Sequence, residues 1–174
     1  MDLGILVLRV LVGLTVAAHG AQKLFGIFRG HGLSGTTQFV ESLGFRPGRP
    51  YAYLLGVAEF AGGALLAMGL FTPVAVSAII GIMTAAAVAV HARNGFFVSD
   101  GGFEYPFMLA SVAAAIAFTG PGSYSLDRLL GLTVNGGAVA LQAIGLGLLA
   151  GLAVTGLRNL RDKVRLGRRR TQTG

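Results

Sequence analysis

The chain contains no cysteine among its 174 residues. This absence excludes disulfide bonds, thiolate metal sites, iron–sulfur clusters, c-type haem attachment and any thiol relay carried by this chain. Charged residues are also scarce, at 12% against roughly 25% in soluble globular proteins. Hydrophobic residues reach 53% and the mean hydropathy is +0.71. A chain of this composition cannot cover a water-exposed surface with charge, and it is too apolar to be disordered.

Acidic residues are fewer than basic residues, with seven Asp and Glu against fourteen Lys and Arg. Seven of those fourteen basic residues lie between Arg158 and Arg170. In a soluble protein such a tail would suggest nucleic-acid binding. Beside long apolar runs it instead indicates the cytoplasmic side of a membrane, where it contacts anionic lipid, and we expect no nucleic-acid partner.

Five apolar segments approach the roughly 20 residues that a helix needs to cross a bilayer. Backbone polar groups have no partners in lipid, so segments of this kind span as helices and not as open strands. The predicted fold class is therefore all-α, a polytopic membrane protein. The predicted spans cover approximately residues 3–28, 52–71, 73–92, 104–119 and 136–157.

Basic residues in the connections predict the orientation of these spans. If the basic tail is cytoplasmic, five crossings place the N-terminus outside the cell. The connections that hold Arg29, Arg46, Arg49 and Arg93 then fall inside, and the outer connections carry only Arg128. This distribution agrees with the positive-inside rule. The first segment has an acidic start and no cleavage site, so we expect a span and not a signal peptide.

Three further segments have recognisable patterns. Residues 37–43 and 123–132 could form short amphipathic helices at the membrane interface, with ordinary loops as the alternative. The last span contains Gly147 and Gly151 in a small-xxx-small arrangement, which favours close helix packing. Packing within the chain and pairing in a homo-oligomer are both compatible with this pattern.

Ionisable residues inside the spans are expected to face the bundle interior and to have partners. His19 and Lys23 are spaced i, i+4 and share one face of the first span. Glu59 lies roughly 10 Å inside the second span, at 1.5 Å per residue, which is the level of His19 and Lys23 on an antiparallel neighbour. The spacing therefore predicts a cluster of His19, Lys23 and Glu59.

Other polar residues occupy different levels. His91, Glu104 and Tyr105 are predicted to form a shallower layer on the cytoplasmic side. Arg9 has no acid at its level in the other spans, so we expect its side chain to snorkel towards the outer interface. Asp127 could reach Arg9 only if the outer connection folds back.

The inner cluster allows two interpretations. It is either a buried ion pair that sets helix register or a site for proton transfer and a quinone head group, with an apolar wall for the isoprenoid tail. Haem is the weaker alternative, because His19 lies deeper than His91. No ligand motif supports a metal site.

The order of several motifs in residues 1–131 resembles the DoxX family of membrane proteins. The fairly specific element is His-Gly-x-x-Lys-Leu-Phe-Gly in the first span. The matching segments are Leu8–Val10, His19–Gly26, Gly56–Gly63, Gly69–Pro73, His91, Gly101–Pro106 and Ser125–Asp127.

The resemblance implies a four-helix DoxX-like membrane domain over residues 1–131, to which residues 132–174 add a fifth transmembrane helix and a basic cytoplasmic tail. It implies a bacterial inner-membrane oxidoreductase subunit, and some actinobacterial members are linked to superoxide dismutase and a sulfurtransferase in defence against oxidative and thiol stress. Its recurrent polar positions correspond to Arg9, His19, Lys23, Glu59, His91 and Glu104.

The leading hypothesis is a membrane component of a redox system that exchanges electrons with quinone. Glu59 and His19 would handle protons, Lys23 would hold an anionic head group or stabilise Glu59, and His91 and Glu104 would line the inner entrance. Arg9 and Tyr105 are the further candidates for cofactor binding. The alternatives are a non-catalytic anchor that recruits soluble redox or sulfur-transfer enzymes, and a small-solute transporter, which would need oligomerisation.

Overall fold

The computed structural model describes the backbone of residues 2–170 and the side chains of residues 2–158. The basic tail was predicted to contact lipid, and apart from Arg158 its side chains lie outside the described residues. Within the described residues every regular element is helical, which confirms the all-α prediction. The α-helices are α1 (Asp2–Phe25), α2 (Gly32–Ser42), α3 (Gly48–Met68), α4 (Thr72–Ala86), α5 (Glu104–Thr119), α6 (Leu126–Leu129) and α7 (Gly137–Arg170).

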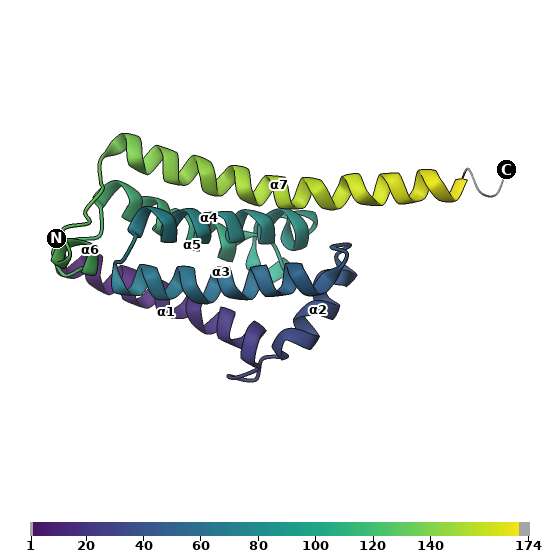
Figure 1. Ribbon diagram of the computed structural model, residues 1–174, viewed down its shortest axis with the longest axis horizontal. Helices are drawn as coiled ribbons and strands as arrows, with labels where there is room; N and C mark the ends of the chain where they lie inside the picture. The colour runs from purple at the N-terminus through teal and green to yellow at the C-terminus, as the bar shows by residue number, and fades with distance from the viewer. Residues whose placement is uncertain (1, 171–174) are drawn as a thin grey trace.

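The long helices lie side by side along one direction, with α4 between α3, α5 and α7, and with α1 on the far side of α3 (Figure 1). The chain runs along α1, returns along α3, and reverses again through a tight turn into α4. Helix α5 carries it back before α7 begins. Five basic residues therefore gather at one end of the bundle, here named the basic end, and they are Arg29, Arg46, Arg49, Arg93 and Arg158.

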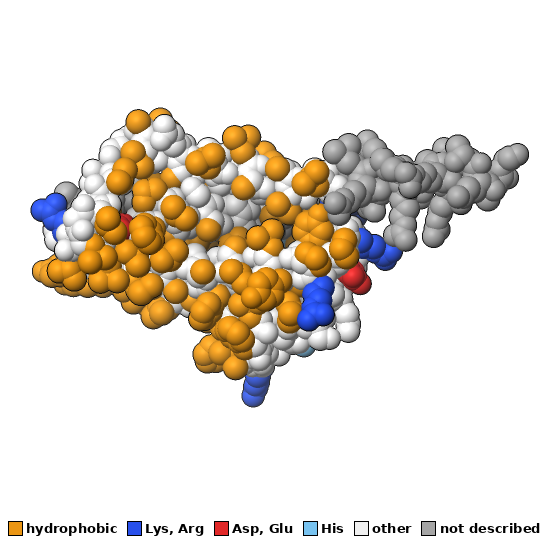
Figure 2. Space-filling model, viewed as in Figure 1, with side chains coloured by type: hydrophobic (Ala, Val, Ile, Leu, Met, Phe, Trp, Pro, Cys, Tyr) orange, Lys and Arg blue, Asp and Glu red, His pale blue; other side chains and the backbone are white. Residues whose placement is uncertain are grey.

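The outer surface fits a bilayer. Hydrophobic side chains cover the long side of the bundle, and the basic side chains lie towards its ends (Figure 2). In the described part of the chain four helical stretches are long and apolar enough to cross a membrane, and they are Asp2–Phe25, Gly48–Met68, Thr72–Asn94 and Gly137–Arg158. Helix α5 has 16 residues and reaches about 24 Å at 1.5 Å per residue. The protein is therefore a polytopic helical membrane protein.

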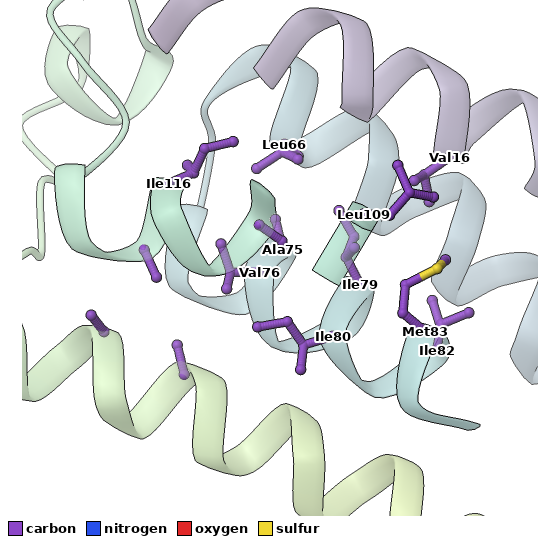
Figure 3. Packing of buried hydrophobic residues seen from close by; sticks show 14 residues of the cluster. Val16, Leu66, Ala75, Val76, Ile79, Ile80, Ile82, Met83, Leu109 and Ile116 are labelled. Atoms are coloured by element: carbon purple, nitrogen blue, oxygen red, sulfur yellow. The ribbon is translucent and has the colours of Figure 1, made fainter. Parts of the chain in front are cut away.

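The main core is built around α4, which contributes buried side chains to all of its neighbours (Figure 3). Ile79 and Val76 are fully buried, and Ile80 and Met83 are nearly so. Their partners come from every neighbouring long helix and include Val16 of α1, Leu66 of α3, Leu109 and Ile116 of α5 and Ala143 of α7.

Glycines allow two helix pairs to approach at backbone distance. A Cβ at Gly147 would lie 2.7 Å from the carbonyl oxygen of Ser77, and one at Gly151 would lie 2.5 Å from that of Gly81. Both glycines of the small-xxx-small pattern therefore pack α7 against α4 within the same chain. Helices α1 and α3 meet in the same way, at Gly20 and Gly63 among other positions.

Most predicted spans match, with differences at their ends. Residues 104–119 agree with α5, and the two short helical pieces are present with other bounds, as α2 over Gly32–Ser42 and as the single turn α6 over Leu126–Leu129. Helix α3 ends at Met68, and the next residue, Gly69, has a left-handed φ of 62° that suits glycine. After α4 the chain continues in a π-helical turn, Ala87–His91. Helix α7 continues to Arg170, past the predicted end of the last span. The division into residues 1–131 and 132–174 stays a prediction.

Candidate functional site

The buried ion pair predicted between the first two spans is present. The Nζ atom of Lys23 donates a hydrogen bond of 2.6 Å to Oε2 of Glu59. The side chain of Glu59 is 7% exposed, whereas that of Lys23 is 24% exposed. The close packing of α1 on α3 sets this register, because Gly20 lies against the backbone of Phe60. The carboxylate is therefore held inside the bundle by its ion pair with Lys23.

His19 and Tyr105 complete the cluster on the side of α5. The Oη atom of Tyr105 lies 3.3 Å from Nε2 of His19, and the two rings pack edge to face with centroids 6.2 Å apart. His19 is also near enough to interact electrostatically with Glu59. The structure therefore brings together the three predicted residues, and it adds the phenol of Tyr105 at the same level.

A cavity of about 390 Å³ opens beside this ion pair, lined by residues of α1, α2, α3, α4 and α7. Its wall is mostly apolar, and its ionisable residues are Lys23, Glu59, His91 and the phenol Tyr51. By helix register, Glu59 lies deeper in the bundle than His91, which is near the basic end. The cavity is therefore a long apolar space with an ion pair in its deep wall and an imidazole near its other end.

Sequence reasoning missed most of the cavity wall. Apolar side chains of α2 and of the connection after it close one side, including Phe39, Val40 and Phe45. Small residues of α4 leave the space open, among them Gly81 and Ala85. The amphipathic pattern of residues 37–43 indicated an apolar face that would pack against the bundle, which fits the side chains of α2. The open space beside α4 could not be predicted, because it depends on how the neighbouring helices pack.

His91 and Glu104 hold the connection between α4 and α5. The Nδ1 atom of His91 lies 2.7 Å from the carbonyl oxygen of Gly101, and only the nitrogen can donate in this contact. Oε2 of Glu104 accepts a bond of 2.8 Å from the backbone N–H of Val98. His91 thus lines the cavity, whereas Glu104 is not among the cavity residues.

Arg9 does not snorkel, and that prediction is wrong. It is 1% exposed, and its guanidinium donates to the carbonyl oxygens of Ala67, at 2.5 Å, and of Tyr124. The outer connection folds back over this end of the bundle and supplies Asp127, which interacts electrostatically with Arg9. Carbonyls and a carboxylate thus replace water around the cation. Arg9 lies at the end of the bundle away from the cavity.

Asp127 also closes the turn between α3 and α4. Its carboxylate accepts hydrogen bonds from the backbone N–H groups of Phe71, at 2.7 Å, and Thr72, at 2.9 Å. The hydroxyl of Thr72 donates a third bond of 2.7 Å. These bonds satisfy free donors at the start of α4. Asp127 therefore joins the outer connection to both the turn and Arg9.

Comparison with known proteins agrees with this architecture. The family model of DoxX matches residues 4–92, which is just over half of the chain and includes most of α1, all of α2, α3 and α4, and the π-helical turn up to His91. The chain belongs to the DoxX family. The matched part of this DoxX protein contains both members of the buried ion pair, Lys23 and Glu59, whereas α5 and α7 lie outside it.

Two named relatives resemble this DoxX chain over most of its length. Inner membrane protein YqjF of Escherichia coli (strain K12) is 31% identical over 131 residues, which is 74% of this chain and 93% of that protein. "Putative oxidoreductase CatD" of Bacillus subtilis (strain 168) is 29% identical over 126 residues, which is 72% of this chain and 86% of that protein. No solved structure shows a significant match.

Proposed function

We propose that this DoxX protein is an inner-membrane component of a redox system and that its cavity binds a quinone. One observation carries the proposal: an apolar cavity of about 390 Å³ has the Lys23–Glu59 ion pair in its wall. The relatives support it in two ways, since one is named an inner membrane protein and the other an oxidoreductase.

The residues present fit such a ligand. The apolar wall suits an aromatic ring and part of an isoprenoid tail, because ligand sites are mostly apolar with a few polar groups that fix orientation. The ammonium of Lys23 has three N–H donors, of which Glu59 takes one. Lys23 therefore has donors left for a carbonyl oxygen of the ring. A bound quinone would supply the electron-carrying chemistry.

Proton exchange is assigned to the carboxylate and the imidazoles. Glu59 would exchange protons with the ligand in the deep part of the cavity, and His19 would exchange with Glu59 from the side of α5. His91 would exchange protons with water near the basic end. Tyr105 and Arg9 are not among the cavity residues, so the quinone site rests on Lys23, Glu59 and His91.

The basic end is proposed to face the cytoplasm, with the N-terminus of α1 outside. The clustering of five described arginines at this end supports this orientation. Soluble redox or sulfur-transfer enzymes would then meet the protein on the cytoplasmic side. A role in defence against oxidative or thiol stress would follow from such partners.

Titration of the purified protein with a menaquinone or ubiquinone analogue tests the quinone site. We expect saturable binding, and we expect Ala85→Phe to weaken it at least about tenfold because the new ring fills the cavity. Glu59→Gln should weaken it about tenfold or more, because Lys23 then loses its anionic partner at the cavity wall and its charged hydrogen bond to the ligand, which contributes about 1.5–3 kcal/mol. Binding is followed by equilibrium dialysis in detergent or nanodiscs.

Leu146→Phe is the matched control, because Leu146 is 63% exposed and does not line the cavity. It should bind the analogue like the wild type. Binding that does not saturate would contradict the quinone site. Equal affinity in the wild type, Ala85→Phe and Glu59→Gln would do the same.

The second candidate function is a membrane anchor for soluble enzymes. The observation that favours it is the continuation of α7 as a helix to Arg170, past the rest of the bundle (Figure 1). Deleting residues 159–174 should then abolish the co-purification of partners, whereas Glu59→Gln should leave it intact. If Glu59→Gln abolishes it in a folded protein and the deletion does not, the anchor is excluded.

A further inference from the structure

A polar side chain lies on the outward face of α7, where hydrocarbon is expected. Gln142 is exposed and lies five residues after the start of α7, roughly 7 Å along the helix. Exposed hydroxyls of other helices bond to their own backbone: Thr15 donates to Leu11, and Ser111 donates to Phe107, both at 2.8 Å. Within the described residues the amide of Gln142 has no such partner.

This difference has a chemical reason. A hydroxyl needs only one acceptor, and the carbonyl four residues earlier supplies it. An amide has two donors and a carbonyl acceptor, which its own helix does not satisfy together. In lipid the remaining groups are costly unless another helix pairs with them, and Gln is one of the residues that hydrogen-bond between membrane helices. We therefore expect a second helix to pair with the amide of Gln142.

Gln142 begins a regular row along α7. The members are spaced three and four residues apart in turn, which is the 3.5-residue period of paired helices. At 100° per residue they fall within one side of the helix, opposite the buried residues that face α4. This row, named the α7 seam, consists of Gln142, Gly145, Leu149, Leu152 and Gly156.

The two glycines of the α7 seam are not explained by packing within the chain. A Cβ at Gly145 or Gly156 would meet nothing within 4 Å. Gly147 and Gly151 differ, because each is pressed against the backbone of α4. Glycine is unfavourable in a helix relative to alanine, and its use at an interface is to let a second backbone come close. The α7 seam is therefore shaped for a helix that the single chain lacks.

We propose that two copies of this chain pair in parallel through their α7 seams, with the two Gln142 amides hydrogen-bonded across a twofold axis. All copies insert with the same topology, so Gln142 has the same depth in each. An amide is complementary to itself, as a twofold interface requires. Leu149 and Leu152 are 66% and 50% exposed in one chain and would pack against their counterparts. The cavity stays on another side of α7, where Ala150 and Val154 line it.

Disulfide cross-linking in membrane vesicles tests this dimer without any assumption about redox function. The chain has no cysteine, so a single introduced cysteine reports on one position alone. Under mild oxidation Leu149→Cys should form a covalent dimer at least about tenfold faster than Leu146→Cys or Leu148→Cys. These leucines are exposed on either side of the α7 seam and serve as matched controls.

The role of the amide is tested in the Leu149→Cys background. Adding Gln142→Leu should weaken dimerisation about threefold to thirtyfold, the range found for hydrogen bonds between membrane helices, and Gln142→Asn should restore part of it. Equal cross-linking at all three leucines, or a product with the mass of a different protein, would overturn the proposal. Unchanged cross-linking after Gln142→Leu would overturn the hydrogen bond between the amides.

Discussion

Replacing Gly20 with alanine is expected to destabilise the bundle by about 3 kcal/mol, at the upper end of what overpacking costs. A Cβ at Gly20 would lie 2.3 Å from the backbone nitrogen of Phe60 and 2.8 Å from the carbonyl oxygen of Gly56. These are backbone atoms of α3 and cannot rotate away, so α1 and α3 must separate. Thermal unfolding of the purified protein in detergent measures the loss.

Gly4→Ala is the control on the same helix. A Cβ at Gly4 would meet nothing within 4 Å, and alanine is favoured over glycine in a helix by about 1 kcal/mol. This variant should be as stable as the wild type or slightly more stable. Equal melting temperatures for Gly20→Ala and Gly4→Ala would show that α1 and α3 are not packed at backbone distance.

Replacing Lys23 with methionine is expected to cost roughly 3–5 kcal/mol of stability, the usual effect of breaking a buried ion pair. The substitution keeps most of the side-chain volume but leaves the carboxylate of Glu59, whose side chain is 7% exposed, without its 2.6 Å partner. Removing the cation therefore lowers the stability more than losing one hydrogen bond would, because the carboxylate of Glu59 stays inside the bundle without its partner. Unfolding free energies in detergent measure the effect.

A double-mutant cycle separates the ion pair from general packing. Glu59→Met leaves Lys23, whose side chain is 24% exposed and can turn towards water, so it should cost less than Lys23→Met. The double variant should recover much of the stability, since apolar replacement of both partners is often neutral. Strictly additive losses would show that the two charges do not interact.

The buried ion pair was predictable because it depends on two neighbouring helices only. His19 and Lys23 share a face through their i, i+4 spacing, and the antiparallel return of the chain brings Glu59 to their level. Hydropathy likewise predicted the helices, including α5 at residues 104–119. These properties are local or arise between consecutive elements, so sequence spacing is enough to derive them.

The surroundings of Arg9 were not predictable in this way. Asp127 and Tyr124 lie more than a hundred residues further along the chain, in a connection whose path depends on where α5 ends and α7 begins. Without that path, snorkelling was the expected behaviour for an arginine near the end of a span. The folded connection made burial possible by supplying carbonyl and carboxylate oxygens.

The cavity and the packing of α7 also depended on tertiary structure. The helices that bound the cavity come from separate parts of the sequence, and an unfilled space results from how their side chains fit together. The glycines of α7 were equally suited to contacts within or between chains until their neighbours in α4 were known. By itself the sequence determined a helical membrane bundle with a paired Lys23 and Glu59, because hydropathy and helical period are carried by adjacent residues. Only the tertiary structure decided that this pair borders a cavity and that Arg9 is buried, because both require contacts between distant segments.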